Sequence, residues 1–228
     1  MSAYCAYAKD PKEYWRIYEI GYADIFQEKL ENYPTEEEPG MRAADFGTCL
    51  HRVLEFLDFK DPPRNLVQIL ADVFRGLEEK YKLEAEKILR GFFQSKVFRS
   101  LQAAKKIYRE IHFVLNERHG RIDGVIDVLF QDAAGDWHIL DYKTAVGDEE
   151  KVRKSAYELQ IAIYAAAAKE ILGIATASAI LYFLKNQWEQ TLKTEPVFLS
   201  SQLERVRGLQ QEIIDFRLQM MKTPLAMT

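Results

Sequence analysis

The first part of the chain, up to about residue 107, repeats its apolar residues at the spacing of an α-helix. In the first of these segments Asp10 stands at a typical N-cap position and Pro11 at the first helical position. The sequence TEEEPG, residues 35–40, predicts a loop after it. We expect helices over residues 10–30, 43–59, 61–77 and 81–95.

The pattern changes near residue 108, where apolar and polar residues begin to alternate. Ile111, Phe113 and Leu115 would share one face of a strand, because successive side chains of a strand point to opposite faces. A later helical segment is long enough to be the crossover that a parallel strand requires. We expect strands over 108–117, 121–130, 136–144, 177–186 and 188–193, and helices over 149–172 and 200–222.

This order of elements predicts an α/β fold in which helices flank a mixed central β-sheet. The chain has 228 residues, 48% of them hydrophobic, which suits one domain with a sizeable core. We therefore expect a single domain over 1–228. Its parts would be a helical N-terminal part (1–107), a core (108–195) and a C-terminal helix (196–228).

Charge and cysteine content narrow the classes of function. The formal net charge is −4, so no overall basic field indicates a nucleic-acid partner, although short basic clusters occur. Cys5 and Cys49 are not in a CxxC pair, which argues against a cysteine-held iron–sulfur cluster and fits a reduced, cytoplasmic setting. The longest apolar run is too short to cross a membrane, and we expect neither a signal peptide nor a membrane partner.

The predicted hairpin over residues 126–144 carries unusual charges. Its turn, DAAG at 132–135, would set Asp127 opposite residue 140 or 141 of the next strand. Asp141 and Lys143 share a face of that strand, and Tyr142 points the other way. Two opposed carboxylates about 5 Å apart repel by roughly 3 kcal/mol at an effective dielectric of about 20. A cation should therefore lie between them; Lys143 supplies one charge, and hard oxygen ligands favour Mg²⁺ as a second.

Two helical motifs add candidates, each with an ordinary structural reading beside the functional one. GTCLHRVLE sets His51 one helical turn before Glu55, yet a helix histidine is more often a packing or surface residue than a ligand. YELQIAIY sets Tyr157, Gln160 and Tyr164 on one stripe, where aromatic residues usually belong to a core. The glutamine in that stripe is exceptional, because a buried amide needs hydrogen-bond partners.

The ordered set of motifs GVID, ILDYKT and QIAIY resembles the core of PD-(D/E)xK nucleases. The variant is the RecB-like one, found at the C-terminus of bacterial RecB and AddA helicase–nucleases. FGTCLHRVLEFLDF resembles the histidine helix that precedes that core, and SAYCAYAKDPKEYWRIYEIGY resembles the start of such domains. The resemblance spans residues 2 to about 195 and implies the restriction-endonuclease-like fold.

The resemblance implies roles for individual residues. His51, Asp127 and Asp141 match metal ligands, as does the backbone carbonyl of Tyr142, and Lys143 matches the catalytic lysine.

Gln160 and Tyr164 match the QxxxY helix that lies along the DNA path. Glu110 falls where the family often has an acidic residue. Asp123, in GRID, resembles the motif of Asp127 four residues early, but its distance to Asp141 is too long. Ile126 replaces the usual proline, and the cysteines that bind an iron–sulfur cluster in some relatives are missing, so we expect no such cluster.

The expected function is a Mg²⁺-dependent DNA exonuclease in repair or recombination, with Mn²⁺ as a possible substitute. It would act on single-stranded or unwound ends, leave a 5′-phosphate and work with a helicase domain or a separate helicase subunit, as the resemblance implies. Exonuclease and endonuclease action both remain open at this point. Two alternatives are a non-catalytic DNA-binding or scaffold module that keeps the fold, and a structural α/β domain in which DYK occurs by chance.

Overall fold

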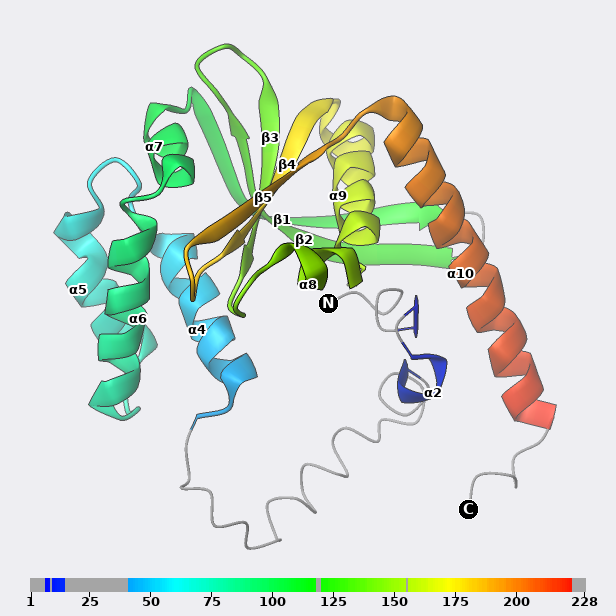
Figure 1. Ribbon diagram of the computed structural model, residues 1–228, viewed down its shortest axis with the longest axis horizontal. Helices are drawn as coiled ribbons and strands as arrows, with labels where there is room; N and C mark the ends of the chain where they lie inside the picture. The colour runs from blue at the N-terminus through cyan, green and yellow to red at the C-terminus, as the bar shows by residue number, and fades with distance from the viewer. Residues whose placement is uncertain (1–6, 9, 15–40, 118–119, 155, 223–228) are drawn as a thin grey trace, which may run out of the picture.

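A five-stranded mixed sheet forms the centre of the protein (Figure 1). The structure is a computed structural model that describes residues 7–8, 10–14, 41–117, 120–154 and 156–222. The strands lie side by side in chain order, and helices flank the sheet, which confirms the expected α/β class. They are β1 (Lys106–Glu117), β2 (Gly120–Gln131), β3 (Trp137–Lys143), β4 (Thr176–Phe183) and β5 (Trp188–Lys193).

The connection between β3 and β4 is a helical crossover. β3 and β4 pair in parallel, whereas the other neighbouring strands pair antiparallel. The crossover consists of α8 (Glu149–Lys154) and α9 (Tyr157–Leu172), so the single helix expected over 149–172 was wrong. Ala156 precedes α9 with ψ 30°, outside the helical region, and this separates the two helices.

Four helices cover one face of the sheet, on the left of Figure 1. Three of them were expected, with bounds that differ by a few residues. The fourth, α7, was missed; Ser95 caps it by accepting a hydrogen bond from the Phe98 backbone N–H at 3.0 Å. The four are α4 (Ala43–Phe56), α5 (Pro62–Val73), α6 (Glu79–Phe92) and α7 (Lys96–Ala103).

The other face of the sheet is covered by α9 and by α10 (Pro196–Lys222), which lie to the right in Figure 1. α10 begins at Pro196 and not at Ser200, because proline is well suited to the first turn of a helix. Near its far end, Phe216 packs against Tyr7 in the N-terminal segment. Of the helix expected over 10–30, the described part is α2 (Pro11–Tyr14), and the rest lies outside the described residues.

The sheet separates two hydrophobic cores. We call them the α9-side core, which includes Ile126, Leu129, Ile139, Ile161, Leu181 and Val206, and the α4-side core, which includes Leu50, Leu54, Phe92, Val128, Leu140 and Tyr142. Among the described residues, no helix combines the length and the apolar character that crossing a membrane would require.

Candidate active site

The β2–β3 hairpin brings Asp127 next to the β3 backbone beside Asp141. The last described pair of this ladder is Val128 with Leu140, and the same register carried one residue further sets Asp127 opposite Asp141. Asp127 Oδ2 accepts a hydrogen bond from the Tyr142 backbone N–H at 2.7 Å. The carboxylate of Asp127 is thus tied to the residue that follows Asp141.

The β1–β2 ladder is interrupted where Glu110 and Asp127 would face each other. Glu110 has φ 46°, in the left-handed region that residues other than glycine seldom adopt. Such backbone strain persists only where the surrounding structure enforces it, and it is concentrated at functional sites. Pairing continues on both sides of the interruption, at Arg109 with Val128 and at Ile111 with Ile126.

The two strands also change faces at this interruption. Ile126 belongs to the α9-side core and Val128 to the α4-side core, although residues two apart on a regular strand share a face. On β1, Ile107 packs against the α4-side core and Ile111 against the α9-side core. Glu110 and Asp127 therefore lie at the boundary between the two cores.

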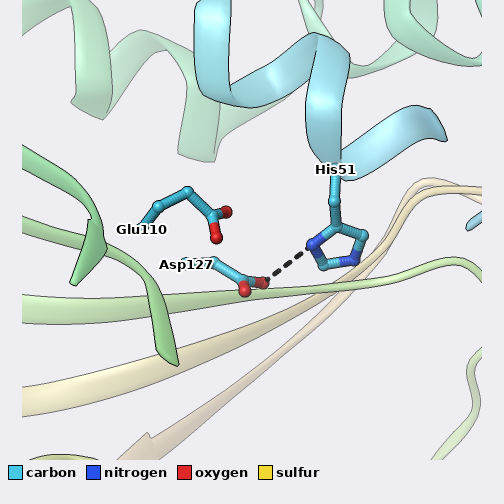
Figure 2. Close-up of side chains that lie close together, drawn as sticks. All are labelled: His51, Glu110 and Asp127. Atoms are coloured by element: carbon cyan, nitrogen blue, oxygen red, sulfur yellow. Dashed lines mark ion pairs between the residues drawn. The ribbon is translucent and has the colours of Figure 1, made fainter. Parts of the chain in front are cut away.

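His51, Glu110 and Asp127 form a group in which one potential ligand atom from each lies within 4.8 Å of the others. His51 projects from α4 toward Asp127, and Glu110 approaches from β1 (Figure 2). His51 Nδ1 is 3.6 Å from Asp127 Oδ2. The side chain of His51 is 32% exposed and that of Asp127 is 11% exposed, so the group is shielded from bulk water but still accessible.

Negative charge dominates this group. Burial alone would lower the pKa of His51, but Asp127, Asp141 and Glu110 outweigh it and raise that pKa above its ordinary value. The pKa of Glu110 is raised too, first by burial and then by the charge of Asp127. Both shifts show that the site has an excess of carboxylate charge, which a cation would neutralise.

Asp141 and Lys143 form a buried ion pair beside the group, with Asp141 Oδ2 2.6 Å from Lys143 Nζ. Asp141 is 2% exposed. Burial and, further, Asp127 raise the pKa of Asp141, while Lys143 opposes them; the pKa of Lys143 is raised because Asp141 outweighs the effect of burial. Despite this ion pair, Asp141 Oδ2 makes no hydrogen bond of normal geometry, so the buried oxygen has unused acceptor capacity.

The ammonium of Lys143 has two further neighbours on α9. Its Nζ donates to Gln160 Oε1 at 2.9 Å and lies 4.7 Å from the centre of the Tyr157 ring. Gln160 Nε2 in turn donates to the Tyr164 hydroxyl at 2.7 Å. The ammonium is therefore held on several sides by the crossover helix and by its own strand.

These donors suit a hard divalent cation. The potential ligands are carboxylate oxygens and one imidazole nitrogen, and the incompletely satisfied Asp141 Oδ2 lies next to them. The mutual raising of pKa values among the carboxylates is a further sign of missing positive charge. The residues present thus fit a metal ion such as Mg²⁺.

Comparison with known proteins assigns the family. The PD-(D/E)XK nuclease superfamily matches residues 3–226, nearly the whole chain. The chain belongs to this superfamily. Large helicase/nuclease proteins are among its relatives: an ATP-dependent helicase/nuclease subunit from Clostridium novyi (strain NT) is 28% identical over 204 residues, which are 78% of this chain. The protein of the same name from Lysinibacillus sphaericus (strain C3-41) is 26% identical over 175 residues, 69% of this chain.

This PD-(D/E)XK chain is short beside those relatives. It spans 16% of the Clostridium novyi protein and 14% of the Lysinibacillus sphaericus protein. Among solved structures, a protein from Eubacterium rectale with a provisional assignment as an exonuclease has a similar fold, with a TM-score of 0.50 at 13% identity. That match covers 78% of this chain and 68% of the other, and it supports the fold alone.

Two of the residues considered in the sequence lie apart from the acidic group of this nuclease. The Tyr142 side chain is buried in the α4-side core, where its ring meets His51 edge-on at 6.1 Å between centroids. A metal-binding role for its backbone carbonyl remains a prediction. Asp123 lies on β2 with its side chain 73% exposed, 3.9 Å from Arg121, and is not part of the group.

Arg109 is a residue whose role sequence reasoning missed. Its Nη1 donates to the backbone carbonyls of Glu55 at 2.9 Å and Leu57 at 2.6 Å, at the C-terminal end of α4. Its guanidinium also lies 4.1 Å from the centre of the Phe59 ring. Arg109 thus joins β1 to the end of the helix that carries His51. Its position directly before Glu110 was the available indication.

Proposed function

We propose that this chain is a Mg²⁺-dependent DNA exonuclease that hydrolyses phosphodiester bonds and can use Mn²⁺ instead. The observation that carries the proposal is the convergence of His51, Glu110 and Asp127 beside the Asp141–Lys143 pair. A purely structural hairpin has no reason to bring these carboxylates together, because their repulsion reduces stability.

The proposed metal ligands are His51, Asp127 and Asp141, with Glu110 beside them and the Tyr142 carbonyl as a further candidate. A bound divalent cation would supply Lewis acidity toward the scissile phosphate and lower the pKa of the attacking water.

The protein's own groups arrange the rest of the reaction. The Lys143 ammonium would stabilise negative charge on the phosphate oxygens as water attacks phosphorus. The P–O3′ bond breaks, the water oxygen stays on phosphorus, and a proton passes to the 3′ oxygen, which gives a 5′-phosphate and a 3′-hydroxyl. Asp127 is kept in place meanwhile by the hydrogen bond from the Tyr142 backbone N–H.

The proposed substrate is a single-stranded or unwound DNA end, processed in repair or recombination. The names of the helicase/nuclease relatives support the view that a helicase, in the same chain or in a partner protein, supplies such ends. The predicted contacts of Gln160 and Tyr164 with the DNA path are part of this proposal.

The test is cleavage of end-labelled single-stranded DNA by the purified 228-residue chain. We expect shortening products with Mg²⁺ and none with EDTA. Asp127→Asn should reduce cleavage by a factor of about 10³ or more, as loss of a key electrostatic group does. Asp123→Asn is the matched control, because Asp123 lies on the same strand outside the group, and it should cleave like the wild type. Equal cleavage by both variants would refute the proposed site.

The alternatives differ in measurable ways. A non-catalytic DNA-binding module would bind the labelled strand but leave it intact with either metal. A structural domain would melt at the same temperature with and without Mg²⁺. The proposed site predicts stabilisation by Mg²⁺ of about 2.7 kcal/mol at a concentration 100 times the dissociation constant, and this stabilisation should be absent in Asp127→Asn.

A further inference from the structure

A chain of three polar contacts leads from the acidic site into helix α9. Asp141 pairs with the Lys143 ammonium at 2.6 Å, and the ammonium donates to Gln160 Oε1 at 2.9 Å. The amide nitrogen of Gln160 donates to the Tyr164 hydroxyl at 2.7 Å. The chain links β3 to two side chains one helical turn apart, as residues at i and i+4 of a helix are.

Both helix residues of this chain are turned inward. Gln160 and Tyr164 are each 8% exposed, and the Tyr164 ring meets the Phe113 ring edge-on at 5.8 Å between centroids. Little of either side chain is therefore available for stacking on a base. The polar atoms of Gln160 instead face Lys143 on one side and Tyr164 on the other.

The contacts fix the direction of the Lys143 ammonium. An ammonium has three N–H donors. One is directed at Asp141 and one at Gln160, while the Tyr157 ring lies against the same group at 4.7 Å. A flexible lysine would otherwise spread over many rotamers, so these partners limit where the remaining donor can point.

A glutamine is well suited to this position. Its amide offers an acceptor to Lys143 and a donor to Tyr164 at the same time. The amide has two possible orientations, and the Tyr164 hydroxyl favours the one in which oxygen faces the ammonium. A leucine would provide neither contact, whereas a glutamate would keep the acceptor for Lys143.

We infer that Gln160 is a positioning residue for the Lys143 ammonium and that Tyr164 maintains the orientation of the Gln160 amide. This role is separate from the DNA contact predicted from the sequence, and its kinetic consequence rests on the proposed nuclease function. Loss of the contact lowers the rate of the chemical step and leaves DNA binding unchanged.

The test compares Gln160→Leu, Gln160→Glu and Tyr164→Phe at saturating Mg²⁺. Gln160→Leu should lower kcat by a factor of about 10 to 100, the effect of a catalytic group that is slightly misplaced, with KM unchanged. Gln160→Glu should restore kcat to within about tenfold of the wild type, because an acceptor again faces Lys143. Tyr164→Phe should lower kcat by about three- to tenfold, as loss of one neutral hydrogen bond does. Glu158→Gln, on the exposed face of α9, is the control and should change neither constant.

A role in DNA contact predicts the opposite order. Gln160→Glu would then place a negative charge on the DNA path, and its KM would exceed that of Gln160→Leu. That order, or an unchanged kcat in Gln160→Leu, would overturn the inference. Circular dichroism and melting temperature confirm that each variant is folded.

A second readout does not depend on nuclease activity. In the metal-free protein labelled with ¹⁵N-lysine, a held ammonium exchanges its protons slowly and gives an NMR signal, which Lys143→Arg assigns. We expect the Lys143 signal in the wild type and in Gln160→Glu, and its loss in Gln160→Leu. Persistence of that signal in Gln160→Leu would contradict the positioning role even if the wild type proved unable to cleave DNA. Absence of cleavage by the wild type would count against the proposed function alone.

Discussion

Glu110 of β1 and Asp127 of β2 occupy facing positions at the interruption of their ladder, and Glu110 adopts φ 46° there. Both strands change from one hydrophobic core to the other at this point. The bend brings the two carboxylates within reach of His51 on α4 (Figure 2). A strained position occupied by an acidic residue therefore lies at the centre of the proposed metal site.

Replacing Glu110 by glutamine should separate stability from activity. The change removes one of the repelling carboxylates, so the metal-free protein should gain about 1 kcal/mol, which raises the melting temperature by a few degrees. Cleavage should fall by about tenfold or more at low Mg²⁺, since metal affinity drops when a charged neighbour is lost. Calorimetry in EDTA and a Mg²⁺ titration of activity measure the two effects. Glu189→Gln, on exposed β5, should alter neither, and a destabilised Glu110→Gln protein would contradict the repulsion.

Replacing Lys143 by methionine should make stability depend strongly on metal. Asp141 would keep a buried charge without its partner, which reduces the free energy of unfolding by about 3 kcal/mol in EDTA. Mg²⁺ should restore part of that loss, because the cation takes over the pairing. Urea denaturation with and without Mg²⁺ checks this. The matched change Lys193→Met, at a surface pair with Glu195 of 3.6 Å, should be neutral in both conditions.

Replacing Arg109 by methionine should weaken the attachment of α4. Two backbone carbonyls at the end of that helix would lose their donor, which should cost about 2 kcal/mol. Because α4 carries His51, the Mg²⁺ concentration needed for half-maximal activity should also rise. The control is Arg99→Met, which loses one exposed contact with the Gln94 carbonyl at 3.0 Å. Similar unfolding curves for the two variants would show that Arg109 does not hold α4.

Alanine at Gly124 should strain the support beneath Tyr164. An added Cβ would lie 2.6 Å from Cζ of the Phe113 ring, which packs against Tyr164. Forcing extra atoms into such a contact destabilises proteins by about 1–3 kcal/mol. Gly208→Ala in α10 meets no atom within 4 Å and should instead stabilise the protein by about 0.5–1 kcal/mol, since alanine favours helices. Denaturant unfolding of both variants tests the opposite signs.

Local patterns account for the features that the sequence predicted well. The alternation of apolar residues and the DAAG turn placed the β2–β3 hairpin, and the observed register continues to Asp127 opposite Asp141, one of the two pairings left open. The parallel β3–β4 pair followed from the need for a crossover. These features depend on neighbours along the chain, so a sequence pattern can carry them. The eight-residue α7 was missed because short helices have too few turns to show a period.

The sequence by itself determined which residue types stand on one hairpin and on one helical stripe, because strand alternation and helical spacing are local geometry. Only the tertiary structure decided that Glu110 joins His51 and Asp127, and that Arg109 holds α4. It alone directed Gln160 toward Lys143. Each of these contacts joins elements far apart in the chain, and it forms because the two cores fix how α4 and α9 pack on a sheet whose first two strands bend at Glu110.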